Sequence, residues 1–180
     1  FCILHSVLAS GRFKQYAQSK MKSHFIYYRL YYTLFAFLTF APLMYYQFTL
    51  SSPNLFSPNS RTKIAGIIIT GFGFVIMAIC IRKYFLQLSG LKSLITEEKK
   101  DQLMVTGIHK IVRHPLYAGT FIFIWGLWLL LPTASLLSTN FIITVYTLIG
   151  IGFEEKKLEQ QFGETYRQYK LNTPMLIPGF

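Results

Sequence analysis

The chain has 180 residues, of which 52% are hydrophobic and only 14% are charged, and its mean hydropathy is +0.38. Soluble domains carry roughly 25% charged residues, so this composition excludes an ordinary soluble domain and indicates a single membrane domain over residues 1–180. The net charge of +11 is typical of basic loops that face anionic lipids. No basic and aromatic surface lies outside the apolar runs, so we do not expect nucleic-acid binding.

Residues 1–9 form an apolar run that is too short to cross a bilayer, which takes about 20 helical residues. We therefore expect this run to be the end of a truncated helix. We do not interpret it as a signal peptide, because it lacks the basic start and the full apolar core of one. Residues 10–27 predict a basic connection, which carries Arg12, Lys14, Lys20 and Lys22.

Four later apolar segments predict membrane-spanning helices, at about residues 28–50, 64–81, 117–131 and 134–152. Pro42 is expected to kink the first of them. Pro132 and Thr133 divide the long run from residue 117 to 152 into two helices folded as a hairpin. The predicted fold class is therefore all-α, a polytopic membrane helical bundle with a C-terminal helical hairpin and a cytoplasmic amphipathic helix.

The polar segments between and after these spans predict loops and surface helices. Residues 51–63 are expected to be a turn-rich loop, and residues 89–111 to form one or two short helices at the membrane surface. Residues 154–180 predict a polar amphipathic helix with an apolar end. Fifteen of the 18 Lys and Arg residues lie in residues 10–27, 82–116 and 153–180. By the positive-inside rule, this asymmetry predicts that these segments face the cytoplasm.

Several chemistries find no support in the pattern. Cys2 and Cys80 lie in apolar stretches and are interpreted as buried thiols, so we expect no disulfide framework, no metal site and no covalent cysteine mechanism. The pair Gly71 and Gly73 lies inside a predicted span, where close helix packing is its expected meaning and nucleotide binding is not.

Two polar clusters lie at the cytoplasmic ends of the predicted hairpin. The first is Arg113 to Gly119, with the sequence RHPLYAG, and the second is Glu154 with Glu155. Pro115 suits the first turn of a helix, whose N-terminus favours a carboxylate, whereas the glutamates favour a cation. Together they match a zwitterionic cofactor such as S-adenosyl-L-methionine.

A purely structural interpretation of the same residues stays open. Arg113 would then be a snorkelling interface residue, His114 a helix cap, and the two glutamates the solvated start of a helix.

The order of these motifs carries a family resemblance. With Gly107 to Gly119 followed by a hairpin and then Glu154 to Tyr169, the chain resembles the isoprenylcysteine carboxyl methyltransferase superfamily over about residues 85–180. Members of that family are integral-membrane methyltransferases that use S-adenosyl-L-methionine. Shorter matches are similar to the NnrU and methanethiol S-methyltransferase branch; they are His5-Ser6, Phe13-Lys14, Leu88 to Lys92 and Tyr169 to Pro178.

The resemblance implies a cofactor pocket enclosed by the hairpin and the last helix. Its lining residues would be His109, Val112, Arg113, His114, Pro115, Tyr117, Gly119, Glu154, Glu155, Tyr166 and Tyr169. Arg113 and Glu155 would be the catalytic pair, with Arg113 orienting either the cofactor carboxylate or an anionic acceptor. For Tyr166 and Tyr169, an aromatic stripe packed on the membrane face is the alternative.

The function expected from the resemblance is methyl transfer to a small or lipophilic thiol or carboxylate, such as methanethiol or a prenylcysteine-like substrate. The expected partners are this acceptor and membrane lipids, while the oligomeric state is left open. Gln87 and His5 are weak candidates for the acceptor side, with packing as their other interpretation. The alternative functions are a non-catalytic NnrU-like membrane protein, a nicotinamide-dependent membrane reductase and a small transporter or channel subunit.

Overall fold

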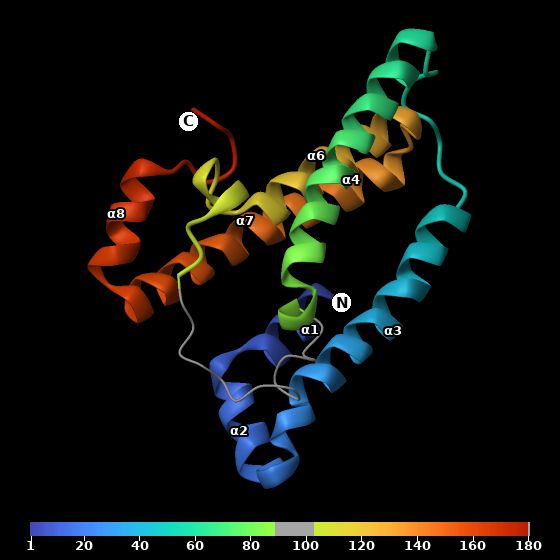
Figure 1. Cartoon of the computed structure of the whole chain (residues 1–180). Helices are drawn as coiled ribbons and strands as arrows, with labels where there is room; N and C mark the ends of the chain where they lie inside the picture. The colour runs from blue at the N-terminus through green and yellow to red at the C-terminus, as the bar shows by residue number, and fades with distance from the viewer. Residues whose placement is uncertain (89–102, 180) are drawn as a thin grey trace. The chain divides into compact units, whose positions relative to one another are not determined.

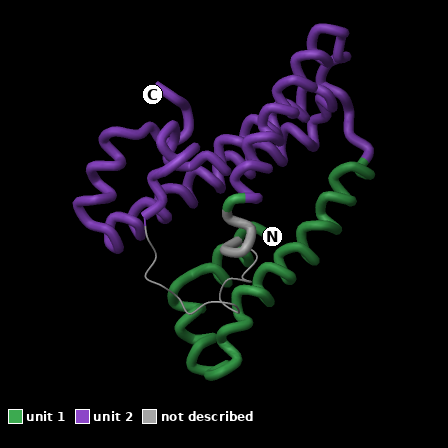
Figure 2. The backbone as a smooth tube through the Cα atoms, in the orientation of Figure 1, with its two compact units in different colours: residues 1–50, 83–101 green, residues 51–82, 102–180 purple. Residues whose placement is uncertain are grey.

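The computed structural model describes residues 1–88 and 103–179, with the backbone alone for residues 84–88. Its regular elements in these ranges are all helices, apart from one isolated bridge between Asn54 and Thr133, which confirms the all-α class (Figure 1). The chain divides into two compact units, shown in green and purple in Figure 2. Unit 1 holds residues 1–50 and 83–101, and unit 2 holds residues 51–82 and 102–180.

Unit 1 begins with short helices that precede one long helix. These elements are α1 (Cys2–Ala9), α2 (Gly11–Met21), the 3-10 helix η1 (Lys22–Tyr27) and α3 (Tyr28–Thr49). The stretch predicted as a basic connection, residues 10–27, is helical from Gly11 onward. Ser10 begins α2 by accepting a hydrogen bond from the Phe13 amide at 3.3 Å, as N-cap serines do. The Tyr28 hydroxyl donates to the Leu8 carbonyl at 2.6 Å and so ties α3 to α1.

Unit 2 contains the helices that position the two polar clusters. They are α4 (Ser60–Leu88, whose last residues pass into unit 1), the 3-10 helix η2 (Gly107–Lys110), α6 (Pro115–Leu130), α7 (Ala134–Phe162) and α8 (Glu164–Asn172). The predicted span at 64–81 is thus only the middle of a longer helix, which Asn59 begins by accepting from the Thr62 amide at 3.0 Å. The predicted surface helices at 89–111 and the motif Leu88 to Lys92 lie largely outside the described residues.

A separate amphipathic helix beginning at residue 154 was the wrong expectation. Residues 152–155 contain no proline, and Gly152 keeps a negative φ within the helix, so α7 runs without interruption to Phe162. The break comes at Gly163, whose φ of +55° lies in the left-handed region that glycine adopts without strain. Glu154 and Glu155 consequently lie inside α7 and not at a helix start.

Helices α6 and α7 are antiparallel neighbours joined by only three residues, Leu131 to Thr133. The Asn140 side-chain amide donates to the Ile124 carbonyl at 2.7 Å, and the Trp125 indole donates to the Thr144 hydroxyl at 3.2 Å. Asn140 is 1% exposed, so its bond to the neighbouring helix satisfies a polar group that would otherwise be costly to bury.

Glycines let α4 and α6 approach closely. A Cβ atom at Gly119 would lie 3.2 Å from the Gly73 carbonyl oxygen and 2.8 Å from Cγ2 of Ile76, and one at Gly73 would lie 2.4 Å from the Phe123 nitrogen. Neither glycine therefore has room for a side chain. Small residues at a crossing allow this kind of backbone contact in membrane helices. The packing role predicted for Gly73 is confirmed, whereas a Cβ atom at Gly71 would meet nothing within 4 Å.

Two of the described helices are long and apolar enough to cross a membrane. They are α4 over Ser60–Lys83, with a mean hydropathy of 2.6, and α7, with 1.7. Only 17% of each apolar window is buried within the protein, whereas the core helix of a soluble domain would be largely covered. Helices also form at the predicted spans 28–50 and 117–131, but that these cross a membrane stays a prediction.

Candidate functional site

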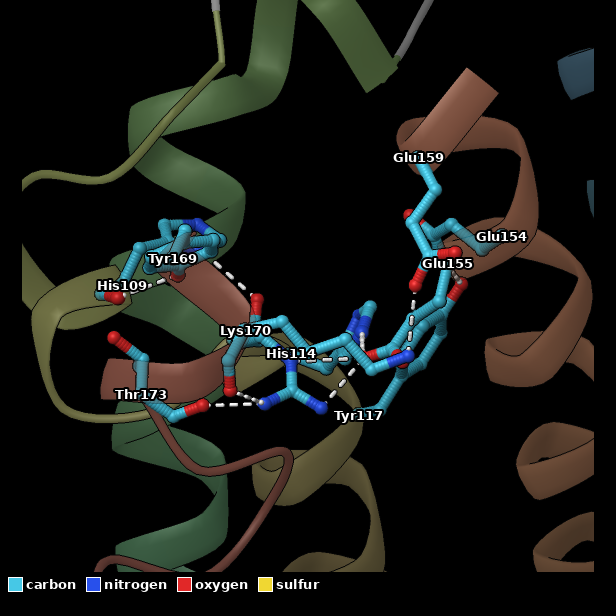
Figure 3. Close-up of polar contacts among 10 residues, drawn as sticks. His109, His114, Tyr117, Glu154, Glu155, Glu159, Tyr169, Lys170 and Thr173 are labelled. Atoms are coloured by element: carbon cyan, nitrogen blue, oxygen red, sulfur yellow. Dashed lines mark hydrogen bonds and ion pairs between the residues drawn. The ribbon is translucent and has the colours of Figure 1, made fainter. Parts of the chain in front are cut away.

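The two polar clusters lie in unit 2, where the start of α6, the C-terminal part of α7 and α8 meet (Figure 3). Backbone bonds bring the segment after α8 against the segment before α6. The Arg113 amide donates to the Pro174 carbonyl at 2.8 Å, and the His114 amide donates to the Met175 carbonyl at 3.1 Å. Pro115 occupies the first turn of α6 as predicted, because its missing N–H costs nothing there. The C-terminal segment thereby holds the first motif in place.

A buried ion pair joins the two motifs across 42 residues of sequence. Nε and Nη2 of Arg113 each lie 2.8 Å from Oε1 of Glu155, and the two side chains are 8% and 9% exposed. Nη1 of Arg113 donates to the carbonyls of Lys170, at 3.0 Å, and Thr173. The guanidinium is therefore bonded to α7 and to the segment that ends α8. The snorkelling interpretation of Arg113 is wrong.

Two further groups complete the surroundings of Glu155. Nε2 of His114 lies 3.2 Å from Oε1 and donates to it, because a carboxylate can only accept. The ammonium of Lys170 lies 3.0 Å from Oε2 of Glu155 and 2.9 Å from Oε1 of Glu159. These contacts, with Glu159 first and Glu155 second, raise the pKa of Lys170. His114 stands at the N-cap position of α6, yet its side chain makes no capping bond there.

Glu154 lies beside this network but outside it. The Tyr117 hydroxyl donates to Oε2 of Glu154 at 3.0 Å, and the ring of Tyr117 stacks on that of His114 with centroids 5.8 Å apart. Glu154 is exposed and forms no ion pair with any described residue. Its carboxylate is thus the acidic group of the cluster that no ion pair among the described residues engages.

Tyr166 and Tyr169 differ in how their hydroxyl groups are satisfied. The Tyr169 hydroxyl donates to the His109 carbonyl at 2.6 Å, and His109 Nδ1 in turn lies 3.0 Å from the Arg113 carbonyl oxygen. Tyr166 is 1% exposed, and among the described residues its hydroxyl has no hydrogen-bond partner. Burial first, and the charge of Glu155 second, raise the pKa of Tyr166. Burial inside unit 2 excludes the membrane-face stripe as the role of Tyr166.

The predicted site residues fall into two groups. Those that share the polar network or border it are His109, Arg113, His114, Tyr117, Glu154, Glu155, Tyr166 and Tyr169. Val112 and Pro115 are buried next to them in sequence, while Gly119 faces α4 at the glycine crossing. Sequence reasoning missed Lys170 and Thr173, which reach the cluster because the chain turns at Gly163. Gly163 is the residue in the sequence that could have predicted this turn, because a glycine often ends a helix.

The weak acceptor-side candidates, His5 and Gln87, belong to unit 1. Nε2 of His5 lies 2.6 Å from the Tyr32 hydroxyl, and the side chain borders a largely apolar cavity of about 450 Å³. The side chain of Gln87 is outside the described residues. Cys80 is buried as expected, while Cys2 is only half-buried, and neither forms a disulfide.

Comparison with known proteins identifies the family. The family model described as phospholipid methyltransferase matches residues 62–165, which is more than half of the chain and contains both motifs. No solved structure matches the chain.

The curated relatives are methyltransferases by name. Methanethiol S-methyltransferase 1 of Bradyrhizobium diazoefficiens is 29% identical over 190 residues, which cover 99% of this chain and 63% of the relative. A methanethiol S-methyltransferase of Pseudomonas sp. is 29% identical, covering 99% of this chain and 69% of the relative. The human protein-S-isoprenylcysteine O-methyltransferase is 29% identical, covering 73% of this chain and 47% of the relative.

The chain therefore spans a little under two thirds of the first of these relatives. The resemblance to isoprenylcysteine and methanethiol methyltransferases is confirmed, while the NnrU likeness stays a prediction. With the family match across both motifs, this chain belongs to the phospholipid methyltransferase family.

Proposed function

We propose that this chain acts as an integral-membrane methyltransferase that uses S-adenosyl-L-methionine and methylates a small or lipophilic thiol or carboxylate. The observation that carries the proposal is the buried Arg113–Glu155 pair, which brings the two motifs of the family match into one polar cluster. Ionisable groups buried at the end of apolar helices are costly to desolvate, so a cluster of them is by default a candidate functional site. The cofactor site faces the cytoplasm of a bacterial inner membrane in this proposal.

The polar groups of the cluster fit this cofactor. S-adenosyl-L-methionine has an ammonium and a sulfonium, which suit the carboxylate of Glu154 that forms no ion pair in the described part of the chain. It also has several acceptor atoms, which suit the hydroxyl of Tyr166 that has no partner among the described residues. A buried hydroxyl without a partner costs about 1–3 kcal/mol, so a ligand acceptor that reached it would be favoured. The proposed lining remains His109, Val112, Arg113, His114, Pro115, Tyr117, Gly119, Glu154, Glu155, Tyr166 and Tyr169.

The protein's contribution to the chemistry would be orientation and exclusion of water. When bound, the cofactor supplies an electrophilic methyl group on a sulfonium. Arg113 and Glu155, tied to each other and to the segment ending α8, hold the ends of α6 and α7 in one geometry. Fixing two reactants in line can supply most of the acceleration of such a displacement, and no general base is needed for an acceptor that is already a thiolate or a carboxylate.

The relatives favour a thiol as the first acceptor to test. The alignments with the methanethiol S-methyltransferases cover 99% of this chain, whereas that with the human isoprenylcysteine enzyme covers 73%. We therefore place methanethiol first and a prenylcysteine-like carboxylate second.

The test is calorimetric titration of the full chain in detergent with S-adenosylhomocysteine, with NADPH as the control ligand. We expect saturable binding of S-adenosylhomocysteine alone, followed by methyl transfer to one of the two acceptors. Binding of NADPH alone would replace the proposal by a nicotinamide-dependent reductase. Binding of neither ligand by folded protein would replace it by a non-catalytic membrane protein.

A further inference from the structure

We propose that the adjacent glutamates have separate roles, in which Glu154 contacts the cationic group of the cofactor and Glu155 is a positioning residue that holds the site together. The inference rests on the proposed function. It divides between two residues a role that the motif alone assigns to both.

Both oxygens of Glu155 are already occupied. Oε1 accepts from Arg113 and His114, and Oε2 lies 3.0 Å from the ammonium of Lys170. The side chain is 9% exposed. A cationic ligand could reach this carboxylate only by displacing one of the protein's own cations, so Glu155 serves the arrangement of α6, α7 and α8.

Glu154 lies outside the ion-pair network, whose own formal charges balance. Arg113 and Lys170 are the cations of the ion-pair network, and Glu155 and Glu159 are its anions, so their formal charges cancel. Glu154 takes no part in that network. Its exposed carboxylate is therefore engaged by no cation of the ion-pair network and is open to an incoming cation.

Helix geometry explains why two adjacent glutamates can differ. Consecutive residues on an α-helix point about 100° apart, so they cannot serve the same contact. Glu155 points into the network, while Glu154 points toward Tyr117 (Figure 3). The Tyr117 hydroxyl holds Oε2 at 3.0 Å and so orients the carboxylate, while Oε1 accepts from no described residue.

The experiment compares Glu154→Gln with Glu155→Gln in the full chain. Two ligands are titrated, S-adenosylhomocysteine and its analogue that lacks the amino group, and the melting temperature of each variant is measured without ligand. The parent should bind S-adenosylhomocysteine about tenfold or more tightly than the analogue, as for a hydrogen bond between charged groups. Glu154→Gln loses the negative charge but keeps an acceptor oxygen, so most of this preference should disappear, and the variant should melt with the parent.

Glu155→Gln should melt at a lower temperature and still discriminate between the two ligands wherever it binds them. Tyr117→Phe should reduce the discrimination less than Glu154→Gln does, because it removes only the group that orients the carboxylate. Discrimination as large as the parent's in Glu154→Gln, or its disappearance in a Glu155→Gln protein as stable as the parent, would overturn the assignment. A folded parent that binds neither ligand refutes the proposed function itself, which is a separate outcome.

Discussion

Replacing Glu155 by methionine should destabilise unit 2 more than replacing Arg113 does. Without Glu155, the guanidinium of Arg113 keeps only the carbonyls of Lys170 and Thr173 and has no buried anion. Without Arg113, Glu155 still has Lys170 at 3.0 Å and His114 at 3.2 Å. Removing one partner of a buried ion pair costs about 3–5 kcal/mol, so Glu155→Met should fall in that range and Arg113→Met below it.

These energies correspond to measurable temperature shifts. For a chain of this length 1 kcal/mol shifts the melting temperature by about 2–4 °C, so Glu155→Met should melt at least about 6 °C below the parent. The double variant, which replaces both charges by apolar groups, should recover part of the loss. Double-mutant coupling between contacting residues is typically about 0.5–3 kcal/mol.

Tryptophan fluorescence during heating in detergent is a suitable assay. The two tryptophans of the chain, Trp125 and Trp128, both lie in α6, so the signal reports unit 2. Glu164→Gln is the matched control, because Glu164 pairs with Arg167 at 3.7 Å while both side chains are about two thirds exposed. Such pairs contribute about 0–1 kcal/mol, so the control should melt near the parent. Shifts below about 2 °C for both single variants, or strictly additive ones, would refute the structural role of the pair.

Three further perturbations give contrasting outcomes. Gly73→Ala should lower the free energy of unfolding by about 1–3 kcal/mol because its Cβ would collide with the backbone of α6, whereas Gly71→Ala, on the same helix, should be neutral or slightly stabilising. Equal melting temperatures for the two variants would contradict the close contact between α4 and α6. Tyr166→Phe should leave the protein without ligand as stable as the parent or more stable, while Tyr169→Phe should lower the free energy of unfolding by about 1 kcal/mol because it loses a hydrogen bond. A lower melting temperature for Tyr166→Phe than for Tyr169→Phe would contradict this difference between the two hydroxyl groups. The pKa of Tyr166 in the folded protein is raised above 10.0, the ordinary value that it has in the unfolded chain, so the stability of the folded state should fall as the pH rises above 10.0. In thermal melts across this range Tyr166→Phe should show a smaller fall than the parent, and an identical pH profile would contradict the raised pKa.

Local signals in the chain predicted the elements of the site correctly where the deciding interaction is itself local. Pro115 predicted the start of α6, since a missing N–H is harmless only in a first turn. The error at residue 154 arose because the change from apolar to polar residues was taken as a helix boundary, although α-helical hydrogen bonds do not depend on that change.

What the sequence by itself determined is therefore the all-helical class, the apolar length of α4 and α7, and the chemical types gathered at the two motifs. These follow from interactions between residues within a few turns of one another, which periodicity and composition reveal.

Only the tertiary structure decided which glutamate meets Arg113, that Lys170 joins them, and that the Tyr166 hydroxyl is buried without a partner. Each depends on how the chain reverses after Leu130 and again at Gly163, which sets the register between elements far apart in sequence. Two adjacent glutamates are equivalent in a motif, but on a helix that packs against another they face different surroundings.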